Sequence, residues 1–196
     1  MKRLNEKNQN TPALSETIFE RRWRKMVHWC DYERFRHLAR GFKGGTYVDL
    51  GCFNSPMPLE IKLAWRDAQV YAVDHAPLVV KTMQAAFPEV HYILADITKT
   101  LPFKDRSADY VVAGEVIEHL EDPEAFIAEC FRILKPGGWL ALSTPLEDDG
   151  KITDEHLWSF TFEDILLFTL NFTSMHEREI RNEPFPTLYF WSKKKL

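Results

Sequence analysis

The chain has 196 residues, of which 45% are apolar and 28% charged, with a formal net charge of −4 and a pI near 6.0. This length fits one α/β domain, and the slight acidic excess argues against a general nucleic-acid binder. No apolar run approaches the roughly 18 residues of a membrane span, and the polar start lacks the apolar segment of a signal peptide. Three scattered cysteines indicate neither a disulfide framework nor a zinc site, which favours a reducing, cytoplasmic location.

The amino-terminal residues divide into two predicted segments. Residues 1–14 are polar and amide-rich and predict a disordered leader. Residues 15–45 predict a helical cap, as one long helix or two short ones that stop at Gly41. Thr17 and Glu20 have the spacing of a capping box, which marks a helix start.

Residues 46–196 predict the main domain, because short β-branched or apolar runs alternate there with helical ones. The last two strands are joined by only NEPFP, too short for a crossover helix, so they form an antiparallel hairpin. The predicted fold class is α/β: a Rossmann-like, doubly wound, seven-stranded mixed sheet of five parallel strands plus that hairpin. The predicted strands are 46–50, 70–74, 91–96, 108–114, 139–145, 173–181 and 187–194, with helices near 58–66, 77–87, 123–134 and 161–170.

The ends of the first four predicted strands each carry an acidic residue or a glycine beside one. A doubly wound sheet binds its ligand at the carboxyl ends of its strands, beside the point where strand order reverses. Asp74 follows Gly51 by 23 residues, near the roughly 20-residue interval at which a carboxylate reaches a ribose diol. Asp96 is placed to accept from an exocyclic amino group such as that of adenine. Each acid alone can instead cap a turn.

Several motifs together resemble the class I S-adenosylmethionine-dependent methyltransferases. They are VDLGC (48–52), VYAVD (70–74), ADI (95–97) and, most specifically, EVIEHLEDPEAFIAECFRILKPGG (115–138). The similar group includes ubiquinone, menaquinone, sugar and natural-product methylases, and the resemblance runs from about Tyr47 to Phe168. It implies S-adenosyl-L-methionine as cofactor and methyl transfer to an O, N or C nucleophile of a small metabolite.

The resemblance also assigns cofactor-binding residues. Asp49 and Gly51 would face the methionine part of the cofactor, Asp74 the ribose, and Asp96 with Ile97 the adenine. The full set is Asp49, Gly51, Cys52, Phe53, Asp74, His75, Asp96, Ile97, Glu115 and Val116.

The first loop departs from the family pattern. The family usually reads DLGCGTG, whereas residues 49–55 read DLGCFNS, so two glycines are missing. Phe53 is costly if its position needs a positive φ. S-adenosylmethionine has no phosphate that the backbone must approach, so cofactor binding is expected to survive. The alternative is a degenerate Rossmann-like binding protein that holds no cofactor.

Two histidines are candidate catalytic residues, because a hydroxyl or ammonium acceptor must lose its proton to a base. His156, in DEHLWSFTFEDIL, lies in a stretch similar to one beside the acceptor pocket of sugar and quinone methylases. His119, in EVIEHL, is the second candidate. Either can instead be a structural hydrogen-bonding residue. The sequence shows no compact cluster of metal ligands, so no metal is predicted.

A nicotinamide-dependent oxidoreductase is the alternative enzyme. Tyr189 and Lys193 have the YxxxK spacing of short-chain dehydrogenases, but on a predicted strand they lie well over 10 Å apart, so the match is accidental. The expected partner is a small-molecule methyl acceptor, with no membrane partner. The arginines of residues 21–24 leave a protein or nucleic-acid acceptor as an alternative.

Overall fold

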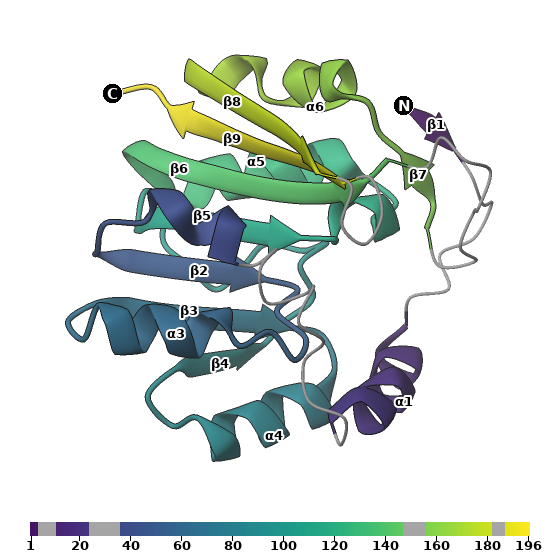
Figure 1. Ribbon diagram of the computed structural model, residues 1–196, viewed down its shortest axis with the longest axis vertical. Helices are drawn as coiled ribbons and strands as arrows, with labels where there is room; N and C mark the ends of the chain where they lie inside the picture. Colours follow the sequence, from purple (N-terminus) through teal and green to yellow (C-terminus); the bar gives the residue numbers. More distant parts are fainter. Residues whose placement is uncertain (4–10, 24–35, 147–155, 182–186) are drawn as a thin grey trace.

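The computed structural model describes residues 1–3, 11–23, 36–146, 156–181 and 187–196 (Figure 1). Its main sheet has seven strands in the order β4-β3-β2-β5-β6-β9-β8. The first five are parallel, and β9 runs antiparallel to both of its neighbours. The predicted fold class is confirmed. The strands are β2 (Thr46–Leu50), β3 (Gln69–Asp74), β4 (His91–Leu94), β5 (Ala108–Gly114), β6 (Leu134–Pro145), β8 (Thr173–Arg181) and β9 (Thr187–Lys194).

Three strand boundaries differ from the prediction, and the smallest difference is at β3, which begins at Gln69, one residue early. Strand β6 begins at Leu134 rather than at 139, because Leu134 already pairs with Ala108 before a register shift. Strand β4 ends at Leu94, because Asp96 turns the chain through hydrogen bonds to Thr98.

The helices begin at recognisable local signals. Proline occupies the first turn of the helices that start at Pro77 and Pro123, where its missing N–H costs nothing. The Asp122 carboxylate accepts a hydrogen bond from the Ala125 N–H, and Thr161 forms a capping box with the residue three positions on. The helices are α3 (Met57–Ala64), α4 (Pro77–Ala86), α5 (Pro123–Ile133) and α6 (Phe162–Phe168).

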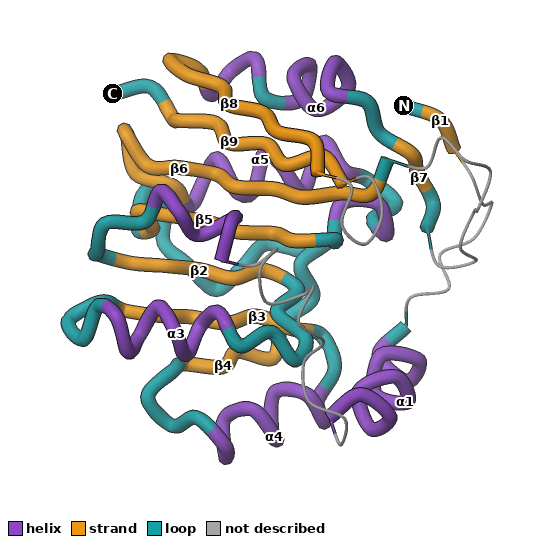
Figure 2. The backbone as a smooth tube through the Cα atoms, viewed as in Figure 1, coloured by secondary structure: helices purple, strands orange, loops and turns teal. Residues whose placement is uncertain are grey.

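Helices cover both faces of the sheet (Figure 2). Helices α3 and α4 pack on one apolar layer, which receives Tyr47 and Tyr110 from the central strands. Helices α5 and α6 pack on the other layer, which receives Val48 and Val111. Alternate residues of the same strands are therefore buried on opposite faces, as a parallel sheet requires. No helix in the described part of the chain is long and apolar enough to cross a membrane.

Regular structure is present in the described parts of residues 1–14. Helix α1 spans Pro12–Trp23, and a short strand β1 (Lys2–Arg3) pairs antiparallel with β7 (Trp158–Ser159). The described parts of the expected leader thus include a strand and a helix start. Residues 24–35, and with them part of the expected helical cap, lie outside the described residues, as do the side chains of the arginines at 21–24.

Thr17 does not begin the first helix, so the predicted capping box is wrong. The Thr11 hydroxyl accepts a 3.3 Å hydrogen bond from the Leu14 N–H, and Pro12 fills the first helical position. The Thr17 hydroxyl donates instead to the Ala13 carbonyl one turn earlier, at 3.0 Å. The helix therefore begins at Pro12 and not at the position that the capping-box spacing indicates.

Candidate functional site

The predicted cofactor residues gather at one edge of the sheet. Strand order reverses between β2 and β5, and the site lies where these strands end. The N–H groups of Gly51 and Cys52 both donate to the Val73 carbonyl, at 2.8 and 3.0 Å, so the loop after β2 folds over the end of β3. Cys52 belongs to this loop. Its side chain is buried in the α3-side layer, so it contributes to the loop through its backbone.

The position of Gly51 strongly favours glycine. Its φ is +74°, and a Cβ there would lie 2.6 Å from Cγ2 of Val116, in the segment after β5. Both the left-handed backbone and the missing side chain are therefore needed. The loop after β2 and the segment after β5 therefore lie in close contact at the switch point.

Phe53 takes the strained conformation that the sequence raised as a concern, with φ at +43°. Such a conformation costs a bulky residue of the order of 1–3 kcal/mol. Two contacts offset the cost. The Phe53 N–H donates to Oδ2 of Asp74 at 3.0 Å, and its ring packs edge-on against Phe19 of α1, with centroids 5.7 Å apart.

Asp74 organises the loops on either side of it. Its Oδ2 holds Phe53 and its Oδ1 accepts from the Ala76 N–H at 2.9 Å, while the side chain is buried. Burial raises the pKa of Asp74, and the hydrogen bonds from Ala76 and Phe53 oppose that rise. Each carboxylate oxygen has a second lone pair, so this shaping role leaves capacity to accept from a ligand.

Asp49 carries a buried polar atom that lacks a protein partner. The side chain is 3% exposed, and its Oδ2 makes no hydrogen bond. Burial, and next the nearby charge of Asp74, raise the pKa of Asp49 to about 7. Buried polar atoms in folded proteins are nearly always hydrogen-bonded. A ligand that brings a donor or a positive charge would therefore complete this site.

Helix α1 closes the end of β3. The Ser15 hydroxyl lies 3.1 Å from Nε2 of His75, and Oε1 of Glu16 accepts from the Leu78 N–H at 2.9 Å, which caps α4. Figure 1 shows α1 at the carboxyl edge of the sheet, next to α4. The sequence predicts a helical cap for residues 15–45 without placing it at this edge, and nothing in the helical pattern points to Ser15 or Glu16.

Asp96 caps a turn. This is the alternative role that the sequence leaves open for each strand-end acid. Its Oδ1 accepts from the N–H and the hydroxyl of Thr98, at 2.9 and 2.7 Å. Partial burial acts to raise the pKa of Asp96, but these hydrogen bonds outweigh it and the pKa is lowered. Ile97 next to it packs partly against the α5-side core.

Glu115 ties the end of β5 to the end of β6. Its φ is +57°, its N–H donates to the Ser143 carbonyl at 3.0 Å, and its Oε1 accepts from the Ser143 hydroxyl at 2.8 Å. Val116 follows it and contacts the Gly51 loop. Sequence reasoning missed Ser143, because a serine late in an apolar strand carries no signal of its own.

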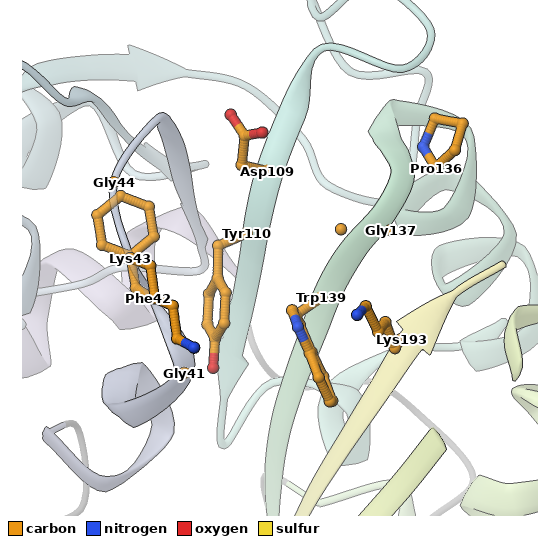
Figure 3. Close-up of a pocket in the computed structure, with 11 residues that line it drawn as sticks. Gly41, Phe42, Lys43, Gly44, Asp109, Tyr110, Pro136, Gly137, Trp139 and Lys193 are labelled. Atoms are coloured by element: carbon orange, nitrogen blue, oxygen red, sulfur yellow. The ribbon is translucent and has the colours of Figure 1, made fainter. Parts of the chain in front are cut away.

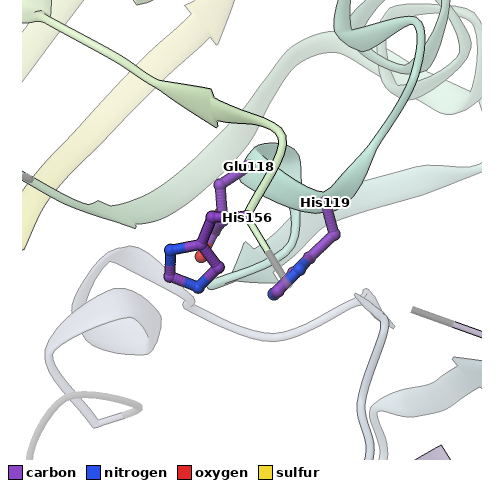
Figure 4. Close-up of side chains that lie close together, drawn as sticks. All are labelled: Glu118, His119 and His156. Atoms are coloured by element: carbon purple, nitrogen blue, oxygen red, sulfur yellow. The ribbon is translucent and has the colours of Figure 1, made fainter. Parts of the chain in front are cut away.

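The two candidate histidines lie against each other. His119 ends the short 3-10 helix η2 (Ile117–His119), and its ring centroid is 4.8 Å from that of His156, with the planes 74° apart. Donor atoms of both rings and of the Glu118 carboxylate all lie within 4.8 Å of one another (Figure 4). The expectation that no compact ligand cluster exists is therefore wrong: the fold brings together residues 37 positions apart in the sequence.

Two hydrogen bonds hold the two segments of this cluster together. The Leu157 N–H donates to the Glu118 carbonyl at 2.8 Å, and the Trp158 indole N–H donates to the Leu120 carbonyl at 2.7 Å. The residues that follow His156 are thus fixed to the chain on both sides of His119.

A pocket lies at the opposite edge of the sheet (Figure 3). This pocket of about 280 Å³ is lined by Tyr110, Trp139 and Lys193, among others, where β5 and β6 begin. Lys193 thus faces this pocket, whereas Tyr189 is buried within β9. The YxxxK spacing forms no dehydrogenase site, as its position on a strand predicts.

Comparison with known proteins identifies the family. Residues 48–142 match the methyltransferase domain family. A probable S-adenosylmethionine-dependent methyltransferase of Mycolicibacterium smegmatis is 31% identical over 137 residues, which cover 68% of this chain and 48% of that protein. The chain belongs to the class I S-adenosylmethionine-dependent methyltransferases.

Other members of the family extend this comparison. A ubiquinone biosynthesis O-methyltransferase of Xanthomonas euvesicatoria pv. vesicatoria is 36% identical over 70% of this chain and 66% of that protein. Among solved structures, phosphoethanolamine N-methyltransferase 2 of Haemonchus contortus shares the fold, with a TM-score of 0.72 at 16% identity over 84% of this chain and 53% of that one. The chain spans about half the length of the first curated relatives that it matches.

S-adenosylmethionine is the cofactor of this methyltransferase family, and the residues present fit it. Asp49 offers a buried oxygen without a protein partner, which suits a cofactor that carries an ammonium and a sulfonium. The Gly51 loop approaches Val116 as closely as a missing side chain permits. The departure at Phe53 is absorbed by Asp74 and α1 without loss of the loop's left-handed turn.

Proposed function

We propose that the protein transfers a methyl group from S-adenosylmethionine to an O, N or C nucleophile of a small molecule. The observation that carries this proposal is the pairing, at one sheet edge, of the Asp49 loop with the His119–His156 pair. The name of the Xanthomonas relative, a ubiquinone biosynthesis O-methyltransferase, supports a small acceptor.

The cofactor assignments follow the strand ends. When bound, the cofactor supplies an electrophilic methyl group on its sulfonium. We propose that Asp49 and Gly51 receive its methionine part, that Asp74 accepts from the ribose, and that Asp96 with Ile97 borders the adenine. The backbone of Cys52 and Phe53 shapes the first loop, His75 positions α1 over it, and Glu115 and Val116 close the pocket.

The acceptor lies on the side of the histidines in this proposal. Methyl transfer needs mainly an in-line placement of the nucleophile, so residues that hold the acceptor carry much of the effect. His156 acts directly on the acceptor, with His119 beside it. The half-buried Trp158 next to them offers apolar surface, as small-molecule sites usually do.

A cytoplasmic location is also proposed. Cys52 and Cys130 are free and buried, a pattern that suits a reducing compartment.

Calorimetric titration tests the cofactor part of the proposal. The purified protein is titrated with S-adenosylhomocysteine and, separately, with NAD. We expect saturable one-to-one binding of S-adenosylhomocysteine only. Binding of NAD alone would support an oxidoreductase, and binding of neither would support a degenerate binding protein.

A turnover assay separates an enzyme from a cofactor-binding protein. The protein is incubated with S-adenosylmethionine and a panel of small hydroxyl, amine and carbon-acid compounds, and formation of S-adenosylhomocysteine is measured. Acceptor-dependent product is the expected result. Cofactor binding with no turnover on any acceptor would contradict the enzymatic proposal.

A further inference from the structure

We propose that Glu118, His119 and His156 form a binding site for one divalent transition-metal ion. Two imidazoles and one carboxylate are a common ligand set for zinc, iron and related first-row ions in proteins. Such a set fills three positions and leaves at least one for water or another ligand. The three side chains come from η2 and from the residue that precedes Leu157, and Figure 4 shows them converging.

The distances suit an ion after a small rearrangement. The donor atoms all lie within 4.8 Å of one another. Bonds of about 2.0–2.2 Å from one ion place neighbouring donors roughly 3–3.5 Å apart. Rotation of the imidazoles about their side-chain torsions, by about an ångström at the nitrogen, closes that gap. The two rings are edge-on, at 74° to each other, rather than stacked.

The Glu118 carboxylate is buried. It is 0% exposed, and buried carboxylates in proteins are paired with positive charges or coordinate metals. His119 and His156 are only partly buried, so an ion and a further ligand can enter from their side.

The neighbouring backbone contacts act as a rigid support. The hydrogen bonds from Leu157 to the Glu118 carbonyl and from Trp158 to the Leu120 carbonyl fix the two ligand-bearing segments to each other. Metal sites depend on such supporting contacts to orient their ligands. The cluster is therefore built from fixed backbone segments rather than from surface side chains that meet by chance.

The ion would act on the acceptor, an inference that rests on the proposed function. The cluster follows Glu115 and Val116 directly in the chain, so it borders the proposed cofactor pocket. A divalent ion lowers the pKa of a hydroxyl that it binds, whose proton then passes to solvent. The acceptor that such an ion would activate is a hydroxyl compound. His119 and His156 are then ligands rather than proton acceptors.

Metal titration tests the site on the full-length, tag-free protein after treatment with a chelator. Co²⁺ is added and followed by visible absorption, and Zn²⁺ is added in a calorimeter. We expect one-to-one binding of each ion. Glu118→Gln, His119→Ala and His156→Ala should each weaken binding by at least about 100-fold, because each removes one of three ligands.

His91→Ala is the matched control, because His91 is an exposed histidine at the start of β4, at the opposite edge of the sheet. It should leave metal binding unchanged. Thermal unfolding checks that each variant is folded. The proposal is overturned if folded wild-type protein binds neither ion in a one-to-one ratio, or if the three ligand variants bind as tightly as the wild type.

Titration with S-adenosylhomocysteine keeps the two proposals apart. Metal binding without S-adenosylhomocysteine binding would retain the metal site and remove the proposed function. S-adenosylhomocysteine binding without metal binding would retain the function and remove the site. Chelator-resistant turnover on a hydroxyl acceptor would overturn the role of the ion in catalysis.

Discussion

The two halves of the carboxyl edge are built in different ways. At the ends of β3 and β4, acidic side chains hold backbone N–H groups of nearby loop residues, as Asp74 does for Phe53 and Ala76. Beyond β5, side chains from two distant segments face each other, as His119 and His156 do. The first half sets the shape of loops, whereas the second half presents donor atoms to a shared space.

This difference assigns separate tasks to the two halves. A shaped loop with the unpartnered Asp49 oxygen suits recognition of a fixed cofactor. A cluster of imidazoles and a carboxylate suits chemistry on the acceptor. Damage to one half should therefore leave the other working.

The largest effect is expected at His156. His156→Ala should lower turnover by roughly 10²–10⁴-fold, because it removes a group that activates the acceptor, either as a base or as a ligand of the proposed ion. Rates of S-adenosylhomocysteine formation measure this loss, with His91→Ala as the control. Its affinity for S-adenosylhomocysteine should stay near the wild-type value. Unaltered turnover would remove His156 from the acceptor half.

Gly51→Ala should damage the cofactor half. A left-handed φ of +74° costs a non-glycine residue about 1–2 kcal/mol, and displacement of Val116 adds roughly 1–3 kcal/mol of overpacking. Urea unfolding and titration with S-adenosylhomocysteine measure the loss of stability and of affinity.

Gly137→Ala provides the matched control for Gly51→Ala. Gly137 has φ +79°, but its added Cβ meets only a side-chain carbon of Leu196, at 3.1 Å, near the carboxyl terminus. It should lose about 1–2 kcal/mol and keep its cofactor affinity. Equal losses of affinity in both variants would contradict the role of the Gly51–Val116 contact.

Asp49 should make the stability of the ligand-free protein depend on pH. Its pKa is about 7 in the fold and near 3.8 when unfolded, so between these values only the folded state holds the proton. The free energy of unfolding should therefore fall as pH rises from about 4 to 7, by on the order of a few kcal/mol, and then level off.

Urea midpoints of the wild type and Asp49→Asn at pH 5, 6, 7 and 8 measure this slope. The variant should show a smaller fall, because asparagine does not ionise. Identical pH profiles would show that Asp49 does not carry a raised pKa.

The smallest effect is expected at Phe53. At most positions alanine is more favourable than glycine, but a φ of +43° reverses that order. Phe53→Gly should therefore be more stable than Phe53→Ala by about 1 kcal/mol, although both lose the contact with Phe19. A more stable alanine variant would show that the loop is not left-handed at this residue.

Much of the fold follows from local sequence signals. Alternating apolar runs and short turns predict β2, β5, β8 and β9 with the boundaries that the structure has. The early start of β6 was not predictable, because it depends on pairing of Leu134 with Ala108 across a register shift. Likewise, the sequence offers helix-start signals at both Pro12 and Thr17. The structure begins α1 at Pro12, where the Thr11 hydroxyl caps the helix.

The candidate site likewise has a part that local sequence signals predict and a part that depends on contacts between distant segments. Strand-end acids are visible in the sequence, because a parallel sheet brings its carboxyl ends to one edge. The contribution of Ser15, Glu16 and Ser143 depends on contacts between distant segments, which single residues do not announce. The same holds for the meeting of His156 with Glu118.

A paired titration tests most directly whether the two halves have separate tasks. S-adenosylhomocysteine and Zn²⁺ are each titrated into the wild type, Asp74→Asn and His156→Ala, all checked for folding. Asp74→Asn should lose affinity for S-adenosylhomocysteine and keep Zn²⁺ binding, because it alters the loops after β2 and β3. His156→Ala should show the opposite pattern. Loss of both ligands in both folded variants would contradict the division of the edge into a cofactor half and an acceptor half.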